Sequence, residues 1–376
     1  MRKIHLIVLI FALLFSISAC KQKKTDKEYI KKVALNQESI AVGIFKATGY
    51  DYPYIDYIAQ ALNIDGGMVY VTLTEADLLK TKLDNIDVLI FPSMDKDQKM
   101  NKLDDEVADI LHDFVTKKGK GAISICNGGE ILTKSTKYQS LDLVNIEFTD
   151  KIYKVNSGII RVGLTEEGKK VFPELKALES FTVDYHYGPK MNILDTISDI
   201  QILAYAEDNK QFPVLINAMC GNGKLVMSNL HPELTPGMRW MIPRMVRWTF
   251  NKERTSYNRK VFRPNLFDKE LSLDEDLNQK SEQLLSVLDN GKKDEVIDAM
   301  DELQGLYPRL AAEKVRSLLL KKNDAIKLRA AKFLVDIEYT LALDDLNEAI
   351  KSERRRKVKE QLTAYRNEMR DMLDQN

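Results

Sequence analysis

Regular alternation between apolar strand-like runs and amphipathic helical patterns is the feature that most constrains the fold of this chain. Four short apolar runs, at 39–45, 69–73, 87–91 and 121–125, are typical of buried strands. Two helical stripes lie between them, formed by Ile55, Ile58, Ala59 and Leu62 and by Val107, Ile110, Leu111 and Phe114. Strands separated by helices of this length pair in parallel, with helices on both faces of the sheet. We therefore predict an α/β domain.

The pattern changes between 143 and 230, where short strand-like runs dominate. They are expected at 145–148, 158–162, 200–204, 214–219 and 224–229. The last two flank Cys220-Gly221-Asn222-Gly223, which is a typical hairpin turn. A helix at about 238–250, with Pro243 near its first turns, would close the domain. The α/β domain should thus span 39–250.

A polar, irregular stretch at 251–270 predicts a linker, and everything after it has helical periodicity. Residues 271–376 carry short apolar stripes of similar length with tight connections between them. This pattern resembles paired HEAT-like helical repeats, and a plain helical bundle is the alternative. Concave helical arrays usually bind proteins, so a protein partner for this region is expected by analogy.

The first twenty residues have the features of a targeting signal. Arg2 and Lys3 precede an apolar run from Ile4 to Phe15, which is short for a membrane-spanning helix. The run ends in Ile17-Ser18-Ala19-Cys20, which resembles a bacterial lipobox. We expect a signal peptide over 1–19, lipidation of Cys20 and a tether over 20–38, so that the protein is extracytoplasmic and lipid-anchored to a bacterial membrane, with the periplasmic face as its site. An ordinary cleaved signal is the alternative.

Composition excludes several classes of partner and cofactor. Lys plus Arg and Asp plus Glu each total 56, so the net charge is zero and nucleic acid is not an expected partner. The chain has three cysteines without a C-x-x-C pair, and four histidines. These numbers predict neither a disulfide scaffold nor a metal site, and we expect no cofactor.

Cys126 follows an apolar strand and precedes Asn127-Gly128-Gly129-Glu130. Small residues after a nucleophile allow the sharp strand-to-helix turn that exposes it above the edge of a sheet. A helix beginning near Glu130 would favour the thiolate, and the amide of Asn127 could stabilise an oxyanion. The alternative is a buried cysteine before a glycine-rich turn.

A second motif, Leu230-His231-Pro232-Glu233, follows the last apolar strand. Proline disfavours helix for the preceding residue, so we expect an extended chain in which His231 and Glu233 point to the same side. The carboxylate could then orient the imidazole, as in a catalytic triad.

Together these motifs resemble the class I glutamine amidotransferase-like superfamily, and within it the group named after the N-terminal domain of biotin–protein ligase. Three stretches carry the finer resemblance: Val42 to Phe45, Gly158 to Gly168 and Tyr185 to Pro189. The resemblance covers about 39–250 and implies a flavodoxin-like three-layer fold with Cys126 as nucleophile, His231 as base and Glu233 as the third member. It also implies a substrate pocket that includes Tyr185, His186, Tyr187 and Gly128.

The chain departs from that superfamily at two places. Asn127 to Glu130 replaces the glycine-x-glutamine segment of true glutaminases, and Pro92-Ser93-Met94 replaces the usual Pro-Gly-Gly oxyanion loop. Backbone amides of Asn127 and of Ser93 or Met94 could still bind an oxyanion. A literal glutamine amidotransferase is therefore not expected.

Two functions follow from the sequence. One is a cysteine-dependent amidohydrolase or acyl transferase that acts on a small-molecule or peptide amide. The other is a non-catalytic lipoprotein that binds a ligand and recruits a partner through its helical region. Cys220 is expected to be a free or buried thiol, because a strand of roughly 20 Å separates it from the end that delivers His231, and a disulfide needs α-carbons within about 7 Å.

Overall fold

A computed structural model describes most of the chain after residue 38. The described residues are 39–46, 53–81, 83–93, 103–134, 140–152, 157–186, 188–194, 199–207, 209–257, 261–266, 275–306 and 308–373. The predictions made for Cys20, the signal, the tether, Met94 and Tyr187 lie outside these residues.

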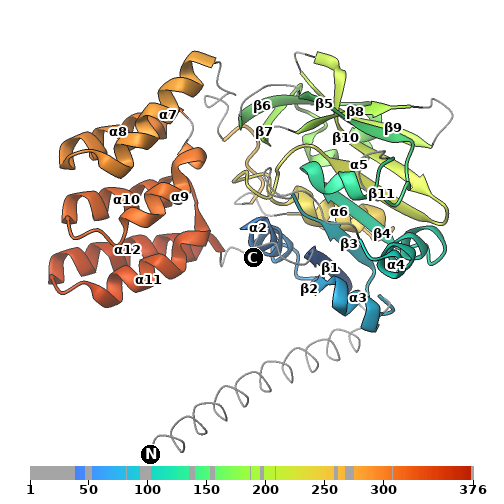
Figure 1. The fold of residues 1–376 in the computed structure, drawn as a ribbon, viewed down its shortest axis with the longest axis horizontal. Helices are drawn as coiled ribbons and strands as arrows, with labels where there is room; N and C mark the ends of the chain where they lie inside the picture. Colours follow the sequence, from blue (N-terminus) through green and yellow to red (C-terminus); the bar gives the residue numbers. More distant parts are fainter. Residues whose placement is uncertain are drawn as a thin grey trace, which may run out of the picture.

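A nine-stranded sheet forms the centre of the α/β domain (Figure 1). Its strand order is β2-β1-β3-β4-β11-β10-β9-β6-β7. The first five strands pair in parallel. The alternating pattern predicted this for the first four of the chain, β1 to β4, whereas β11 comes from the stretch where that pattern changes. Their bounds are β1 Ile40–Lys46, β2 Met68–Thr74, β3 Val88–Phe91, β4 Gly121–Ile125 and β11 Gly223–Ser228.

Helices cover both faces of this parallel half. They are α2 Pro53–Leu62, α3 Glu75–Thr81, α4 Asp105–Thr116 and α6 Met241–Thr249. Because parallel crossovers are right-handed, the reversal of strand order after β2 places α2 on one face and α3 and α4 on the other. The contacts agree, since α2 packs on α6 and α3 packs on α4. The predicted fold class, a three-layer α/β domain followed by helices, is confirmed.

The other half of the sheet is antiparallel. It consists of β10 Asn209–Cys220, β9 Ile200–Ala206, β6 Ser157–Leu164 and β7 Phe181–His186, with α5 Glu166–Val171 and the 3₁₀ helix η2 Pro173–Leu175 after β6. A separate two-stranded sheet pairs β5 Ile146–Ile152 with β8 Pro189–Ile193. The predicted hairpin is present: Cys220 pairs with Gly223, and Gly221 has φ +56°, which glycine adopts without strain.

The placement of β11 brings two distant parts of the chain together. This strand inserts between β4 and β10 and runs parallel to β4, with Ser228 opposite Ile125. Cys126 follows β4 directly, and His231 follows β11 by three residues. The two motifs that the sequence suggested therefore leave the sheet at the same edge, where open α/β sheets bind their ligands.

The C-terminal region is helical and has its own apolar core. Its elements are α7 Glu275–Asn290, α8 Lys293–Leu306, α9 Pro308–Leu318, α10 Asp324–Asp336, η3 Thr340–Ala342, α11 Leu343–Ser352 and α12 Arg356–Leu373. Contacts join α7 to α8, α9 to α10 and α11 to α12, and these pairs lie in layers in Figure 1. Among the described residues, no helix combines the length and apolarity needed to cross a bilayer.

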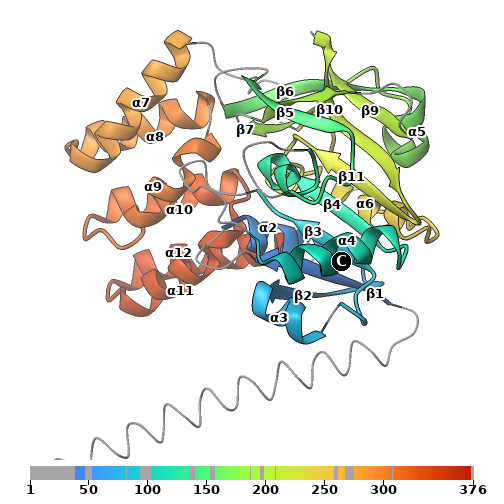
Figure 2. The ribbon, with the colours of Figure 1, turned by 45° about the vertical axis from the view of Figure 1, so that its right-hand side comes forward.

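The helical region packs beside α2 of the α/β domain (Figure 2). The rings of Tyr57 and Tyr339 lie 6.0 Å apart across this junction. Tyr57 and Leu234 both belong to the helical core cluster although they come from the α/β domain. Within the segment expected to be a linker, Tyr257 and Phe262 pack on the α/β core, and Arg263 N donates to Gly237 O at 3.0 Å. Part of that segment is thus a packed element.

Candidate functional site

Cys126 lies at a strained turn at the end of β4. Its φ is +51°, in the left-handed region that costs a residue with a side chain of order 1–3 kcal/mol. Such strain clusters at functional sites, and here it lies at the turn that the glycines predicted. The following segment is a 3₁₀ helix, Cys126–Ile131, and not an α-helix. The expected support of a thiolate by an α-helix N-terminus is therefore absent from this described turn.

Gly128 explains why small residues follow Cys126. A β-carbon at this position would lie 2.3 Å from Pro92 O and 2.5 Å from Phe91 O, both backbone atoms. The turn therefore packs directly on the end of β3. In the same contact, Ser93 Oγ donates to Asn127 Oδ1 at 3.1 Å, and Ser93 is buried. The two described residues proposed as oxyanion donors, Ser93 and Asn127, are thus adjacent beside Cys126.

His231 and Glu233 form a fully buried pair. The Nδ1 atom of His231 lies 2.7 Å from Glu233 Oε1, and both side chains are 0% exposed. The sequence predicted the pair correctly but not its backbone. Leu234 N donates to His231 O and Thr235 N donates to Pro232 O, both at 3.1 Å, so the segment is turned rather than extended.

Electrostatics link this pair to Cys126. Burial on its own would lower the pKa of His231, but the Glu233 carboxylate and the Cys126 side chain outweigh burial and raise that pKa to about 10. This shift favours the imidazolium form of His231 at neutral pH. Its Nε2 atom makes no hydrogen bond of ordinary geometry with a described residue, and the same holds for Glu233 Oε2. An unpartnered buried imidazole nitrogen is costly unless the site uses it.

A second histidine lies beside the first. The rings of His186 and His231 are 4.8 Å apart, and Cys126 Sγ lies 3.6 Å from the carbonyl oxygen of His186. Burial lowers the pKa of His186, Asp184 opposes this effect, and the charge of His231 adds to it. His186 Nε2 is 3.9 Å from Asp184 Oδ1. Two neighbouring imidazoles, one charged and one neutral, therefore border the thiol.

Several residues around the site were not found by sequence reasoning. Asp184 and Thr235 hold β7 against the turn that follows β11: Asp184 N donates to Thr235 Oγ1 at 2.9 Å, and that hydroxyl donates to Asp184 Oδ2 at 3.0 Å. Tyr54, at the start of α2, stacks 5.5 Å from the His231 ring. Asp184 directly precedes the Tyr185-His186 motif, and this adjacency could have identified it as a site residue. No sequence pattern around Tyr54 indicated that it lies at the site.

The remaining predicted residues are placed as follows. Tyr185 is fully buried and its hydroxyl donates to Gly188 O at 2.7 Å, so its role at a substrate pocket stays a prediction. Cys220 is free and buried, as expected, and Sγ donates to Leu143 O at 2.9 Å. Burial raises the pKa of Cys220 to about 12. This thiol is therefore unreactive near neutral pH.

No metal site is seen in the described part of the chain, where no three His, Cys, Asp or Glu side chains are grouped to hold an ion. The reactive and titratable groups described at the site are the Cys126 thiol, the imidazoles of His186 and His231, and the buried carboxylates of Asp184 and Glu233.

Comparison with known proteins assigns no family. No family model matches the chain, and no curated protein matches it.

Similarity to solved structures is low. The chain is similar to a ThuA-like protein from Parabacteroides merdae, at 10% identity and a TM-score of 0.43, over 60% of this chain and 100% of that one. It is also similar to the CTPS glutaminase domain with bound acivicin from Trypanosoma brucei, at 8% identity and a TM-score of 0.40, over 59% and 97% of the two chains. A β-galactosidase from Bacillus circulans matches at 13% identity and a TM-score of 0.38, over 57% of this chain and 32% of that one. Similarities at this level do not by themselves assign a function.

Proposed function

We propose that this chain is a thiol-dependent amidohydrolase or acyl transferase of the class I glutamine amidotransferase-like kind. The observation that carries the proposal is the buried His231–Glu233 pair, with an unpartnered Nε2 atom, next to a cysteine in a strained turn. A buried ion pair of this kind contributes little to stability by itself. Its value lies in holding one imidazole in a defined orientation and charge state.

The reaction begins with ionisation of Cys126, whose thiol proton passes to solvent because His231 is already favoured as the imidazolium. In the described conformation Sγ donates to the carbonyl of His186, a contact that a thiolate cannot make. We therefore propose that the side chain turns from this carbonyl toward His231 Nε2 as the thiolate forms. The imidazolium, held by Glu233, then pairs with the thiolate.

The remaining steps use the same groups. The Cys126 thiolate forms a bond to the carbonyl carbon of an amide or ester, and the carbonyl π electrons move to oxygen. Collapse of this intermediate breaks the bond to the leaving group, which takes a proton from His231 Nε2. The resulting thioester is attacked by water or another nucleophile, which gives a proton to Nε2, and collapse releases the product and the thiolate.

Charge on the substrate oxygen needs hydrogen-bond donors beside Cys126. The amides of Asn127 and of Ser93 or Met94 are the proposed donors. The contact between the Ser93 and Asn127 side chains supports this assignment, because it holds the ends of β3 and β4 together at the site. The substrate class is a small-molecule or peptide amide.

The test is a covalent trap on the full chain. With p-nitrophenyl acetate, we expect a burst of nitrophenolate equal to the enzyme concentration and an acetyl group on Cys126 in the mass spectrum. Cys126→Ala and His231→Ala should abolish the burst, whereas Cys220→Ser, the matched thiol control, should retain it. A burst that survives Cys126→Ala, or its absence from the unmodified protein, would refute the assignment.

A second function is favoured by one observation. Cys126 is only 5% exposed and its thiol proton is donated to a backbone carbonyl, as in an inert buried cysteine. The α/β domain would then bind a ligand without turnover, and the helical region, which we propose to be HEAT-like, would recruit a protein. The trapping experiment separates the two functions.

We also propose that the mature protein is tethered by lipidated Cys20 at the extracytoplasmic face of a bacterial membrane. The lipobox-like Ile17 to Cys20 supports this proposal. The membrane fraction of cells that express the unmodified chain should contain it, with a mass increase from acylation. Cys20→Ala should remove both the mass increase and the membrane association.

A further inference from the structure

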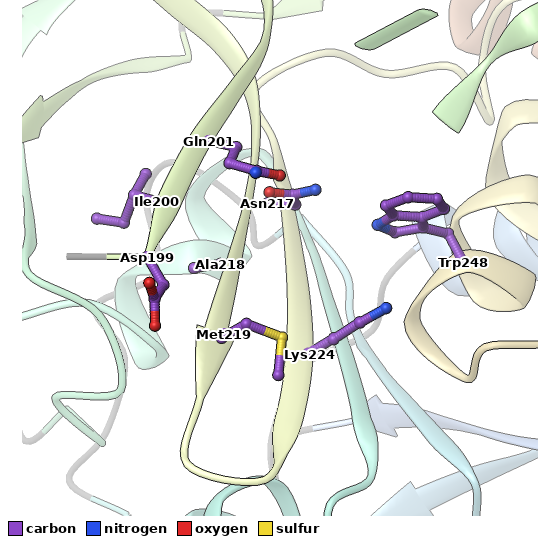
Figure 3. A pocket seen from close by; sticks show the side chains of 8 residues that line it. All are labelled: Asp199, Ile200, Gln201, Asn217, Ala218, Met219, Lys224 and Trp248. Atoms are coloured by element: carbon purple, nitrogen blue, oxygen red, sulfur yellow. The ribbon is translucent and has the colours of Figure 1, made fainter. Parts of the chain in front are cut away.

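A polar groove lies at the opposite end of β11 from His231, and the proposed chemistry does not use it. Its volume is about 540 Å³, within the range of roughly 300–1,000 Å³ usual for small-molecule sites. Strands β9, β10 and β11 form one wall and α6 contributes the other (Figure 3). The lining residues are Asp199, Ile200, Gln201, Asn217, Ala218, Met219, Lys224 and Trp248.

Strand register sets the polar groups of this groove in a row. Asn217 is paired with Gln201 across β10 and β9, and Met219 is paired with Lys224 across β10 and β11. Directly opposed residues share a face of the sheet, as do residues two apart on one strand. All four side chains therefore lie on the face that α6 covers in part, and Figure 3 shows them lining the groove.

The two amide side chains have hydrogen-bonding capacity to spare. Neither Asn217 nor Gln201 makes a side-chain hydrogen bond to another described residue, although Asn217 is only 8% exposed. Each amide can donate two hydrogen bonds and accept two. Asn217, which is nearly buried, gains if a ligand satisfies it, whereas Gln201 is exposed and offers its amide at the mouth of the groove.

The α6 wall carries an aromatic ring, and the one cation of the lining, Lys224 on β11, lies against that ring. Lys224 Nζ lies 5.0 Å from the centroid of the Trp248 ring and is hydrogen-bonded to Asn251 Oδ1. In Figure 3 the ring nitrogen of Trp248 is on the side that faces Asn217. The indole thus presents an N–H donor and an apolar edge toward the amides.

We propose that this groove binds a carbohydrate. A sugar ring combines apolar C–H surface with several hydroxyls that both donate and accept, and planar amides beside an indole match that combination. The groove holds one ammonium, Lys224, and one carboxylate, Asp199, so it has no excess positive charge for a phosphate-bearing ligand such as a nucleotide. A single aromatic ring also offers no slot for a base between two planes.

The two tryptophans of the chain make a direct experiment possible. Trp240 is fully buried, whereas Trp248 is partly exposed at the groove, so a ligand there changes the emission of Trp248. The full chain is titrated with hexoses, N-acetylhexosamines and their di- to tetrasaccharides at up to millimolar concentrations. Calorimetry gives the affinity of each sugar that changes the emission. We expect a saturable change with at least one member of this panel.

Variants then locate the site. Gln201→Ala and Trp248→Phe should each weaken binding at least tenfold by calorimetry. Lys252→Ala is the matched control, because Lys252 lies over the Phe250 ring outside the groove, and it should bind unchanged. Cys126→Ala should also bind unchanged, which separates this proposal from the thiol chemistry. If no sugar of the panel binds, or if Gln201→Ala and Trp248→Phe bind as tightly as the unmodified chain, the proposal is overturned.

Discussion

Replacement of Glu233 by glutamine tests whether its charge holds His231 as a cation. Glutamine keeps the size of the side chain and can still accept from Nδ1, but it carries no charge. At the 2.7 Å separation of the pair, an effective dielectric constant of roughly 20 gives a gross attraction of about 6 kcal/mol, or roughly four decades in the proton affinity of His231. Burial acts in the opposite direction, and the pKa of His231 is about 10 with both effects present.

Without the carboxylate, burial dominates and the pKa of His231 should fall below neutrality. Cys126 then loses its cationic partner at pH 7. Replacement of Glu233 should therefore slow the alkylation of Cys126 by iodoacetamide. For thiols in general, about 3% are ionised at pH 7 when the pKa is near 8.5, so full pairing with a cation can raise the thiolate fraction by up to about 30-fold. The lower nucleophilicity of a low-pKa thiolate reduces this ratio to roughly three- to fourfold.

The assay measures alkylation of Cys126 from pH 5 to pH 10 in a Cys220→Ser background. The chain has only four histidines, so NMR can follow the His231 imidazole in the same samples. The rates of the two proteins should converge at alkaline pH, where any thiol ionises. The reasoning is refuted if the rates agree within about twofold between pH 6 and pH 8, or if His231 of Glu233→Gln still titrates above pH 8.

Three further changes test the packing around the site and the helical region. Gly128→Ala should lower the free energy of unfolding, measured by denaturant titration, by about 1–3 kcal/mol, because the added methyl group meets backbone oxygens. The control is Gly66→Ala, whose methyl group has no neighbouring atom within 4 Å. An equal loss of stability in the control would contradict the prediction. Arg239→Ala removes the hydrogen bonds that this side chain donates to the carbonyls of Glu233, beside the site, and Glu338, in the helical region. The loss should lower the free energy of unfolding by about 2 kcal/mol and slow the alkylation of Cys126. Unchanged alkylation kinetics would show that the helical region does not support the site. Lys327→Met should cost about 2 kcal/mol in thermal unfolding at pH 7, because it removes a charged hydrogen bond from the buried Glu353 carboxylate and leaves Arg355 as its cationic partner; no loss would contradict this.

Acid titration adds a check on the last pair. Hydrogen bonds from Lys327, from backbone amides and from the Arg355 side chain lower the pKa of Glu353 to about 2 in the folded protein. A depressed carboxyl pKa stabilises the fold at pH values above the unfolded pKa near 4.5, and this contribution disappears as the pH falls toward 2. Lys327→Met should therefore show a shallower loss of stability between pH 4.5 and pH 2 than the unmodified chain.

Local sequence patterns were sufficient to predict many of the strands and helices of this protein. The apolar runs at 69–73 and 121–125 became β2 and β4, and the stripes at 55–62 and 107–114 became the buried faces of α2 and α4. These elements were predictable because period and polarity act over a few residues. The sharp turn at Cys126 and the proximity of His231 to Glu233 were predictable for the same reason, because each depends on residues that are close in the sequence.

Tertiary structure decided what depends on residues far apart in the chain. Insertion of β11 beside β4 places His231 near Cys126 across a separation of about a hundred residues, and no local pattern encodes that pairing. His186 and Asp184, the second imidazole and its carboxylate, lie on β7, which is the edge strand at the opposite end of the sheet from β2. They reach the site because Asp184 is hydrogen-bonded to Thr235, in the turn that follows β11. The charge of His231 depends on complete burial together with Glu233, because a carboxylate shifts an imidazole this strongly only when water is excluded from both.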